Sequence, residues 1–227
     1  MGCCIIVGAG ECTGLLQPVE EADCLIAADG GLAHVKNLGL TPDVILGDFD
    51  SLGYVPEGAN VFPVRKDDTD TMLAIRRGLE LGYHNFLIYG GLDGPRLDHT
   101  LANIQSLLFL TRRGCRGALI GKDSIALIAE PPGFTLEGPK GGLLSLFSLG
   151  EKAEEVTLRG LEYPLEKGCL PGDFPLGVSN HFLGGKAEIA LEAGCLLAVY
   201  DRKAGLPTDF FGRHNHDKRD RIRIPGL

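Results

Sequence analysis

Short apolar runs in the first half of the chain, each closed by glycine, constrain the fold more than any other feature. They stand at residues 3–7, 24–28, 44–46 and 86–89. Continuous apolar segments of this length fit strands that are buried on both faces of a parallel sheet. The glycines that follow them predict tight turns or close approaches between backbones.

Two segments between these runs carry apolar side chains at helical spacing. These side chains are Met72, Ile75 and Leu79 in residues 70–81, and Leu97, Leu101, Ile104 and Leu108 in residues 97–113. Each set predicts the apolar stripe of an amphipathic helix. Strands that alternate with helices predict an N-terminal three-layer α/β domain, with a mostly parallel sheet, over residues 1–130.

The pattern changes after Pro131-Pro132-Gly133, where glycines break the chain into short segments. These segments are residues 134–136, 143–148, 156–160, 186–191 and 195–200. Several alternate apolar and polar residues, and none forms a convincing amphipathic helix. We therefore expect a C-terminal all-β domain over residues 131–205, a sandwich of jelly-roll-like form or a partial barrel. Residues 206–227 read as a polar tail, and Arg202 and Lys203 are counted with this basic end.

The charge balance excludes one class of partner. The 22 Lys and Arg against 30 Asp and Glu give a net charge of −8, which argues against a nucleic-acid surface. An anionic ligand such as a nucleotide stays open, because backbone amides and bound metal supply positive field. The 44% of hydrophobic residues suffice for a packed core.

The seven cysteines form no Cys-x-x-Cys pair, so a structural zinc site is not expected. They fit reduced thiols. The N-terminus lacks the pattern of a signal peptide, and no apolar run approaches the ~18 residues that span a membrane. We therefore expect a cytoplasmic protein with no membrane partner.

Four acidic clusters fall where predicted strands end, at residues 29–31, 47–51, 66–70 and 90–99. In open α/β sheets, ligands bind beyond the carboxyl ends of the strands. Carboxylates crowded on one edge repel one another unless a cation lies among them, and hard oxygen ligands favour Mg²⁺. The pair Asp48 and Asp50 is the sharpest candidate, since residues i and i+2 of an extended backbone face the same side. The alternative is an ordinary Gly-Asp-Ser turn.

Other polar residues of these clusters have structural alternatives as well. Thr69 or Asp70 fits the N-cap of the helix that follows, and a helix N-terminus also favours phosphate. Lys66 and Arg96 are candidates for binding phosphate oxygens, or else solvated surface charges. Asp98 and His99 open a predicted helix. At this position the carboxylate of Asp98 could serve only as a negative charge at the helix N-terminus, and His99 could have a capping or orienting role.

Two motifs in the second half offer groups that recognise a flat ring. Tyr163, within residues 160–165, presents an aromatic ring for stacking. Ser179 and Asn180, within residues 177–182, offer a hydroxyl and an amide for ring heteroatoms. Taken singly, these residues are ordinary strand and turn residues.

Six motifs in this order resemble the thiamine pyrophosphokinase (thiamine diphosphokinase) family. They are Asp29-Gly30-Gly31, Pro42-Asp43 with residues 47–51, Lys66-Asp67-x-Thr69-Asp70, residues 90–99, residues 160–165 and Val178-Ser179-Asn180. The resemblance implies an α/β catalytic domain, a β-sandwich domain, and a homodimer with its active sites in clefts between subunits. It also implies that the pyrophosphoryl group of ATP is transferred to the hydroxyethyl group of thiamine, giving thiamine diphosphate and AMP.

The resemblance implies roles for individual residues too. Asp48, Asp50 and Asp70 would hold Mg²⁺, with Asp29 nearby as a fourth catalytic carboxylate, and Asp70 is the first candidate for receiving the hydroxyl proton. The residues implied for ATP and its phosphates are Gly30, Gly31, Ser51, Lys66, Asp67, Thr69, Arg96, Asp98 and His99. Tyr163 would pack on a thiamine ring, and Ser179 and Asn180 would bind its aminopyrimidine. Some family members carry Trp at the position of Tyr163.

Three alternatives remain open. Residues 44–51 resemble the apolar strand and Asp-x-Asp of a haloacid-dehalogenase-like phosphatase, although that motif normally opens a chain. A non-catalytic nucleotide-sensing module would bind ATP without forming AMP. The third alternative keeps the enzyme and changes the acceptor alcohol.

Overall fold

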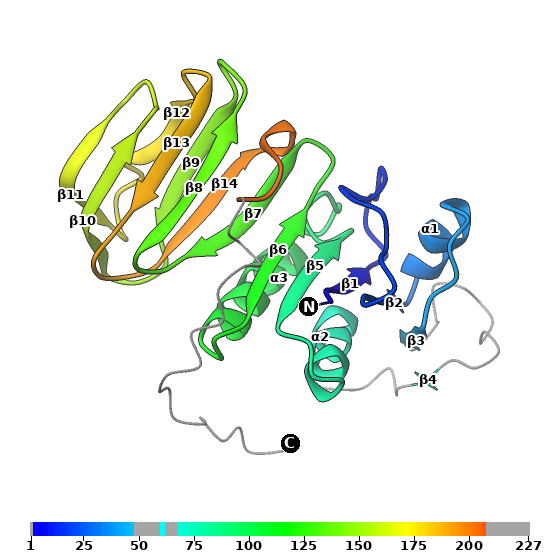
Figure 1. Cartoon of the computed structure of the whole chain (residues 1–227). Helices are drawn as coiled ribbons and strands as arrows, with labels where there is room; N and C mark the ends of the chain where they lie inside the picture. Colours follow the sequence, from blue (N-terminus) through cyan, green and yellow to red (C-terminus); the bar gives the residue numbers. More distant parts are fainter. Residues whose placement is uncertain (1, 48–59, 62–67, 208–227) are drawn as a thin grey trace.

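The computed structural model describes residues 2–47, 60–61 and 68–207 of the chain. One large sheet organises them (Figure 1), with the strand order β12-β9-β14-β7-β6-β5-β1-β2-β3-β4. Its parallel half consists of β1 (Cys4–Val7), β2 (Cys24–Ala28), β3 (Val44–Gly47), β4 (Asn60–Val61), β5 (Asn85–Tyr89) and β6 (Arg116–Ile120). The four apolar runs thus form β1, β2, β3 and β5, as their composition predicts.

The same sheet continues into an antiparallel half. This half consists of β7 (Ser124–Ala129), β14 (Leu196–Asp201), β9 (Leu143–Ser148) and β12 (Gly177–His181). A second, wholly antiparallel sheet has the order β11-β10-β13-β8. Its strands are β11 (Leu165–Pro171), β10 (Lys152–Arg159), β13 (Gly185–Ala190) and β8 (Gly133–Gly138). The expected combination of an α/β part with an all-β part is confirmed, whereas the jelly-roll form and the domain limits near residue 130 stay predictions.

Helices cover the parallel half on both faces, because alternate strand residues point to opposite sides. Helix α1 (Gly31–Asn37) buries Leu32 and Val35 beside Ile5 and Val7 of β1. Helices α2 (Asp70–Glu80) and α3 (Leu97–Thr111) share the other core cluster with the remaining strand side chains. The second sheet packs into the same core cluster as α1, so a single apolar core extends from α1 into the space between the two sheets.

The buried face of α3 differs from the predicted one. Leu97 and Leu101 are 72% and 55% exposed. The buried residues are instead Asn103, Ser106, Leu107 and Leu110. The two polar members are buried at low cost because their side chains donate hydrogen bonds, Asn103 to the carbonyl of Gly91 and Ser106 to that of Ala102. The predicted stripe was right at Ile104, which packs against the core, and wrong at Leu97 and Leu101, because it counted apolar residues alone.

Helix α2 matches its prediction closely, with Ile75 buried and Met72 and Leu79 packed against the core. A short 3₁₀ helix, η1 (Arg202–Ala204), follows β14. No helix among the described residues is long and apolar enough to cross a membrane.

Candidate functional site

Glycines bring three chain segments into direct backbone contact at the carboxyl ends of β1, β2 and β5. A Cβ atom on Gly31 would lie 1.8 Å from the carbonyl oxygen of Val7, and one on Gly10 would lie 2.4 Å from that of Gly90. Gly90 itself has a φ of +71°. Only glycine fits at such distances, so backbone packs directly on backbone at this edge of the sheet, where open α/β sheets bind their ligands.

Asp29 lies at this edge, immediately after β2. Its φ of +48° is in the left-handed region, which is uncommon for a residue other than glycine. Its amide donates to the carbonyl of Leu46 at 2.8 Å, and its carbonyl accepts from the amide of Leu32 at 3.2 Å. The backbone is therefore fixed on both sides in a strained conformation, a feature that clusters at functional sites. Gly30 is the N-cap of α1, and Gly31 is its first residue.

Thr69 is the N-cap of α2. Its Oγ1 accepts a hydrogen bond from the amide of Met72 at 3.2 Å, and Asp70 stands in the first helical turn. Of the two capping alternatives, the structure thus selects Thr69. Asp68, just before it, pairs with Arg76 at 2.7 Å. The positive end of the helix dipole stabilises the carboxylate of Asp70 and favours an anionic ligand beside it.

Arg96 is the N-cap of α3, and Asp98 and His99 stand in the first turn of this helix. A guanidinium nitrogen of Arg96 lies 2.6 Å from a carboxylate oxygen of Asp98. This hydrogen bond lowers the pKa of Asp98 and raises the pKa of Arg96. Both side chains are about two-thirds exposed, and His99 is also exposed, in the first turn of α3. The pair therefore presents a pre-oriented guanidinium to solvent, which suits bidentate binding of a phosphate.

Tyr163 and Asn180 meet in the all-β part, although 17 residues separate them in the sequence. The amide oxygen of Asn180 accepts from the backbone amides of Tyr163 and His181, each at 2.9 Å. Its amide nitrogen donates to the carbonyl of Tyr163 at 2.8 Å. Asn180 is 6% exposed, whereas Tyr163 is 61% exposed. The buried amide thus fixes the backbone that presents the aromatic ring.

Ser179 lies on β12, the edge strand of the large sheet. Its φ of +61° is left-handed, and the pairing of β12 with β9 shifts register between Gly177 and Asn180. The amide of Ser179 donates to Oγ of Ser145 at 3.1 Å. This irregularity turns Ser179 out of the regular strand pattern, as bulges do next to binding sites.

The structure does not bring the two groups of predicted residues together within one chain. Asp29, Gly30 and Gly31 follow β2, while Ser179 and Asn180 lie on β12. Seven strand-to-strand steps separate β12 from β2, which at about 4.8 Å a step amounts to roughly 34 Å across the sheet. Asp48, Asp50, Ser51, Lys66 and Asp67 lie outside the described residues. Within the described ranges, no three His, Cys, Asp or Glu side chains gather closely enough to hold a metal.

Two side chains near this edge were not selected from the sequence. Lys122 pairs with Glu11 at 3.2 Å, and its backbone amide donates to the carboxylate of Asp93. Arg202 binds the segment that follows β1. Both lie far along the chain from the residues they contact, and no motif marks them. In the sequence, only Gly8 and Gly10 after the first apolar run indicated that this segment makes close backbone contacts.

Comparison with known proteins identifies the family. The model of the thiamin pyrophosphokinase catalytic domain matches residues 15–118, and that of the thiamin pyrophosphokinase vitamin B1 binding domain matches residues 133–196. The two models together cover most of the chain and both of its structural parts. The chain belongs to the thiamin pyrophosphokinase family.

Individual relatives agree with this assignment. A thiamine pyrophosphokinase of Bacillus subtilis is 26% identical over 189 residues, which cover 79% of this chain and 88% of the relative. The crystal structure of thiamine pyrophosphokinase from Bacillus subtilis has a TM-score of 0.75 and covers 88% of this chain and 99% of its own, at 26% identity. A thiamin pyrophosphokinase family protein from Enterococcus faecalis has a TM-score of 0.73 at 25% identity, covering 87% and 98%.

Proposed function

We propose that this chain transfers the pyrophosphoryl group of ATP to the hydroxyethyl oxygen of thiamine, yielding thiamine diphosphate and AMP. The observation that carries the proposal is the match of both halves to the two domains of one family, catalytic and vitamin B1 binding. The glycine-lined strand ends lie in the first half. The exposed ring of Tyr163 lies in the second.

The transfer needs positioning and charge neutralisation more than covalent help. The hydroxyl oxygen of thiamine attacks the β-phosphorus, and the bond between this phosphorus and the oxygen bridging to the α-phosphorus breaks, so that AMP leaves. The hydroxyl proton passes to a carboxylate, for which we propose Asp70. Gly30, Gly31 and Thr69 offer the N-terminal ends of α1 and α2 to phosphate, and Arg96, oriented by Asp98, binds phosphate oxygens together with Lys66.

We propose Mg²⁺ as the metal, held by Asp48, Asp50 and Asp70 with Asp29 nearby. Support comes from the chemistry of the donor set, which consists of hard carboxylate oxygens, and from the place of Asp70 in the first turn of α2. When bound, the ion neutralises negative charge on the transferring phosphates. Ser51, Asp67 and His99 complete the proposed phosphate-binding set.

We propose that the thiamine ring packs on Tyr163 and that Ser179 and Asn180 complete its binding site. The exposed aromatic ring supports stacking. The left-handed backbone at Ser179 supports a functional role for this irregular edge. An acidic site on the nucleotide side also attracts the positively charged thiamine.

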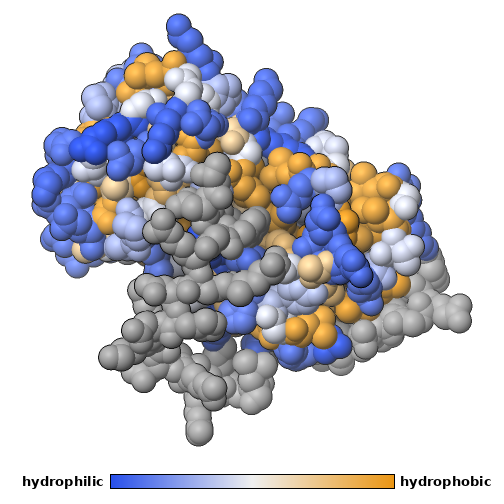
Figure 2. Space-filling view, viewed as in Figure 1, coloured by the Kyte–Doolittle hydropathy of each residue, from blue (hydrophilic) through white to orange (hydrophobic). Residues whose placement is uncertain are grey.

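We propose a homodimer in which each site combines the nucleotide side of one subunit with the thiamine side of its partner. The seven strand-to-strand steps between the two groups within one chain, roughly 34 Å at about 4.8 Å a step, support this arrangement. The edge strand β12 and its surroundings also expose large apolar side chains, a feature of protein interfaces. They are Leu143, Phe147, Phe174, Leu176, Val178 and Leu183. By contrast, hydrophilic side chains dominate the outer side of the second sheet, at the left of Figure 2.

A cytoplasmic location remains part of the proposal. Its support is that all seven cysteines are free thiols, which fits a reducing compartment.

The deciding experiment measures AMP release from ATP and Mg²⁺, with and without thiamine, and identifies the second product by mass. We expect AMP and thiamine diphosphate in equal amounts, and little AMP without thiamine. Rapid phosphate release from a general phosphomonoester in the absence of ATP would instead establish a phosphatase. ATP binding without AMP formation would establish a nucleotide-sensing module.

A further inference from the structure

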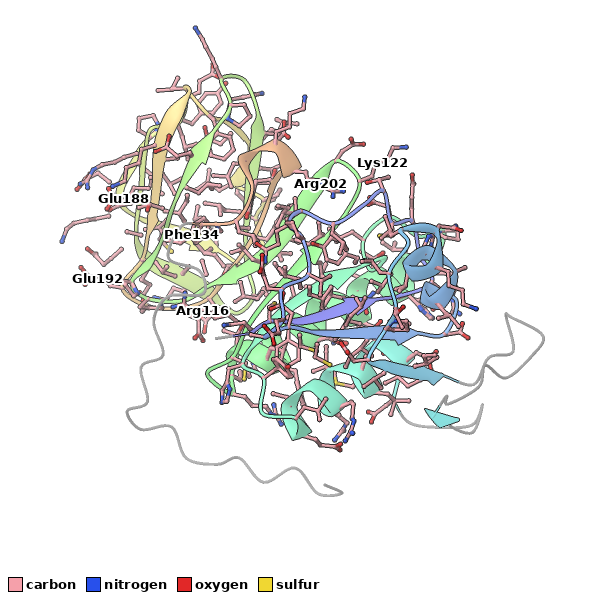
Figure 3. All side chains as sticks on the ribbon, turned by 45° about the vertical axis from the view of Figure 1, so that its right-hand side comes forward. Arg116, Lys122, Phe134, Glu188, Glu192 and Arg202 are labelled. Atoms are coloured by element: carbon pink, nitrogen blue, oxygen red, sulfur yellow. The ribbon has the colours of Figure 1, made fainter. Side chains whose placement is uncertain are left out.

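Arg202 holds together three segments that are far apart in the sequence. It stands at the start of η1, directly after β14, the last strand among the described residues. Its guanidinium donates to Oγ1 of Thr13 at 2.8 Å, to the carbonyl of Gly14 at 2.7 Å and to the carbonyl of Gly121 at 2.8 Å. Figure 3 shows Arg202 at the end of the all-β part, close to Lys122 of the turn between β6 and β7. Arg202 is therefore an anchor and does not belong to a solvated basic tail.

The segment that Arg202 binds leads back to the glycine-lined strand ends. Residues 8–16 leave β1 at Val7, and Gly10 packs directly against the backbone of Gly90. A second anchor lies further along, where the hydroxyl of Tyr89 accepts from the amide of Leu16 at 3.1 Å. Burial raises the pKa of Tyr89 to about 12, so this hydroxyl stays protonated at neutral pH. The segment is thus tied down on both sides of the Arg202 contacts.

The geometry of these contacts suits arginine. A guanidinium presents its N–H groups in a fixed planar fork, so binding three acceptors on two segments costs less side-chain entropy per hydrogen bond. Hydrogen bonds from a charged donor are also stronger than neutral ones. Lysine carries a compact ammonium on a flexible stem and does not reproduce this pattern.

We propose that Arg202 is a positioning residue for the nucleotide site, fixing residues 8–14 so that their backbone stays at the ends of β1 and β5, where ATP phosphates bind. This inference rests on the proposed function for the identity of the nucleotide. It gives the end of β14, in the all-β part, an indirect effect on ATP binding. Arg202 does not touch the substrate and acts through the segment it holds.

The test is nucleotide binding by the full chain, measured by calorimetry with Mg²⁺ and α,β-methylene-ATP, an analogue that cannot release AMP. We expect Arg202→Gln to weaken binding about tenfold, the equivalent of ~1.4 kcal/mol. Thr13→Val, which removes one acceptor, should weaken it by a smaller factor, and Arg202→Lys should be intermediate. In steady-state assays the KM for ATP should rise while the KM for thiamine stays within about twofold.

Two control variants separate positioning from general stability. Lys203→Gln removes the same charge from the exposed neighbouring residue of η1. Arg159→Gln removes another arginine with two partners, Glu166 and Glu188, on the second sheet. Both should bind the analogue like the unaltered chain. Unchanged binding in folded Arg202→Gln and Thr13→Val, or equal losses in Arg159→Gln, would overturn the inference. If the unaltered chain binds the analogue but makes no AMP with thiamine, the proposed function fails while this test still stands.

Discussion

The two halves of the large sheet present functional residues in different ways. In the parallel half every strand ends at the same edge, so Gly8, Asp29 and Gly90 gather there although they come from three separate parts of the sequence. In the antiparallel half neighbouring strands end at opposite edges, and no common edge exists. There Asn180 of β12 meets Tyr163, which lies between β10 and β11 of the second sheet, through hydrogen bonds of its side-chain amide. A parallel sheet thus assembles a site by topology, whereas an antiparallel sheet needs particular side-chain contacts.

The largest effect is expected on the parallel side. Asp50→Asn should lower turnover by about a hundredfold to a thousandfold, because a carboxylate proposed to hold the metal is lost while the shape is kept. The melting temperature should stay nearly constant. Assays of AMP release and thermal unfolding on the same preparation check this, with Glu80→Gln on the surface of α2 as the control. A loss of stability as large as the loss of activity would show that Asp50 is a structural residue.

The backbone contacts at the strand ends should be nearly as sensitive. Gly31→Ala places a methyl group 1.8 Å from the carbonyl oxygen of Val7, so β1 and α1 must separate. We expect a loss of about 3 kcal/mol or more in the free energy of unfolding, measured by denaturant titration. Gly150→Ala, where a Cβ meets nothing within 4 Å, should change the free energy little. A stable Gly31→Ala chain would mean that these elements are not tightly packed.

Mixing two defective subunits tests whether the halves cooperate across a dimer. Chains with Asp50→Asn and chains with Tyr163→Ala are co-expressed and assayed at low thiamine. If each site uses both subunits, the mixed dimers contain one intact site. Random pairing then restores up to about a quarter of the unaltered activity. Activity no higher than that of the two variants measured separately would place both groups of residues in one chain's own site.

The smallest effect is expected at Asn180. Asn180→Ala frees the backbone at Tyr163, so the KM for thiamine should rise about tenfold while the KM for ATP stays constant. Combining it with Tyr163→Ala should add little, because both changes remove the same presented ring. Asn85→Ala serves as the matched control. Asn85 is buried like Asn180, but it is the first residue of β5 and lies at the other end of this strand from Gly90. Fully additive losses would show that Asn180 acts independently of Tyr163.

The sequence predicted the parallel half better than the antiparallel half for a physical reason. Strands buried on both faces, such as β1 and β5, are continuous apolar runs and were recognised, although β6 and β7 were missed despite similar burial. Strands β11 and β12 have mostly half-buried or exposed residues, so their pattern resembles that of loops and both were missed. Helix α1 was missed as well. It has seven residues and no side-chain hydrogen bond at its N-cap.

The candidate site was also predictable only in part: its local features could be predicted, but its long-range contacts could not. Thr69 was recognised as a possible cap because its position before an amphipathic pattern is a local signal. The contacts of Asn180 with Tyr163 and of Arg202 with Gly14 span 17 and 188 residues. No local pattern encodes such distances, and they follow only from the complete fold.

The unbroken ten-stranded sheet has a mechanical consequence. Continuous pairing from β12 to β4 ties both kinds of binding surface to one stiff framework, so they cannot swing toward each other as hinged domains do. In the proposed dimer, the gap across which ATP and thiamine meet is then set by how the two frameworks dock. A small rotation between subunits would widen or narrow both gaps. Substitutions at the subunit interface would therefore change the catalytic rate.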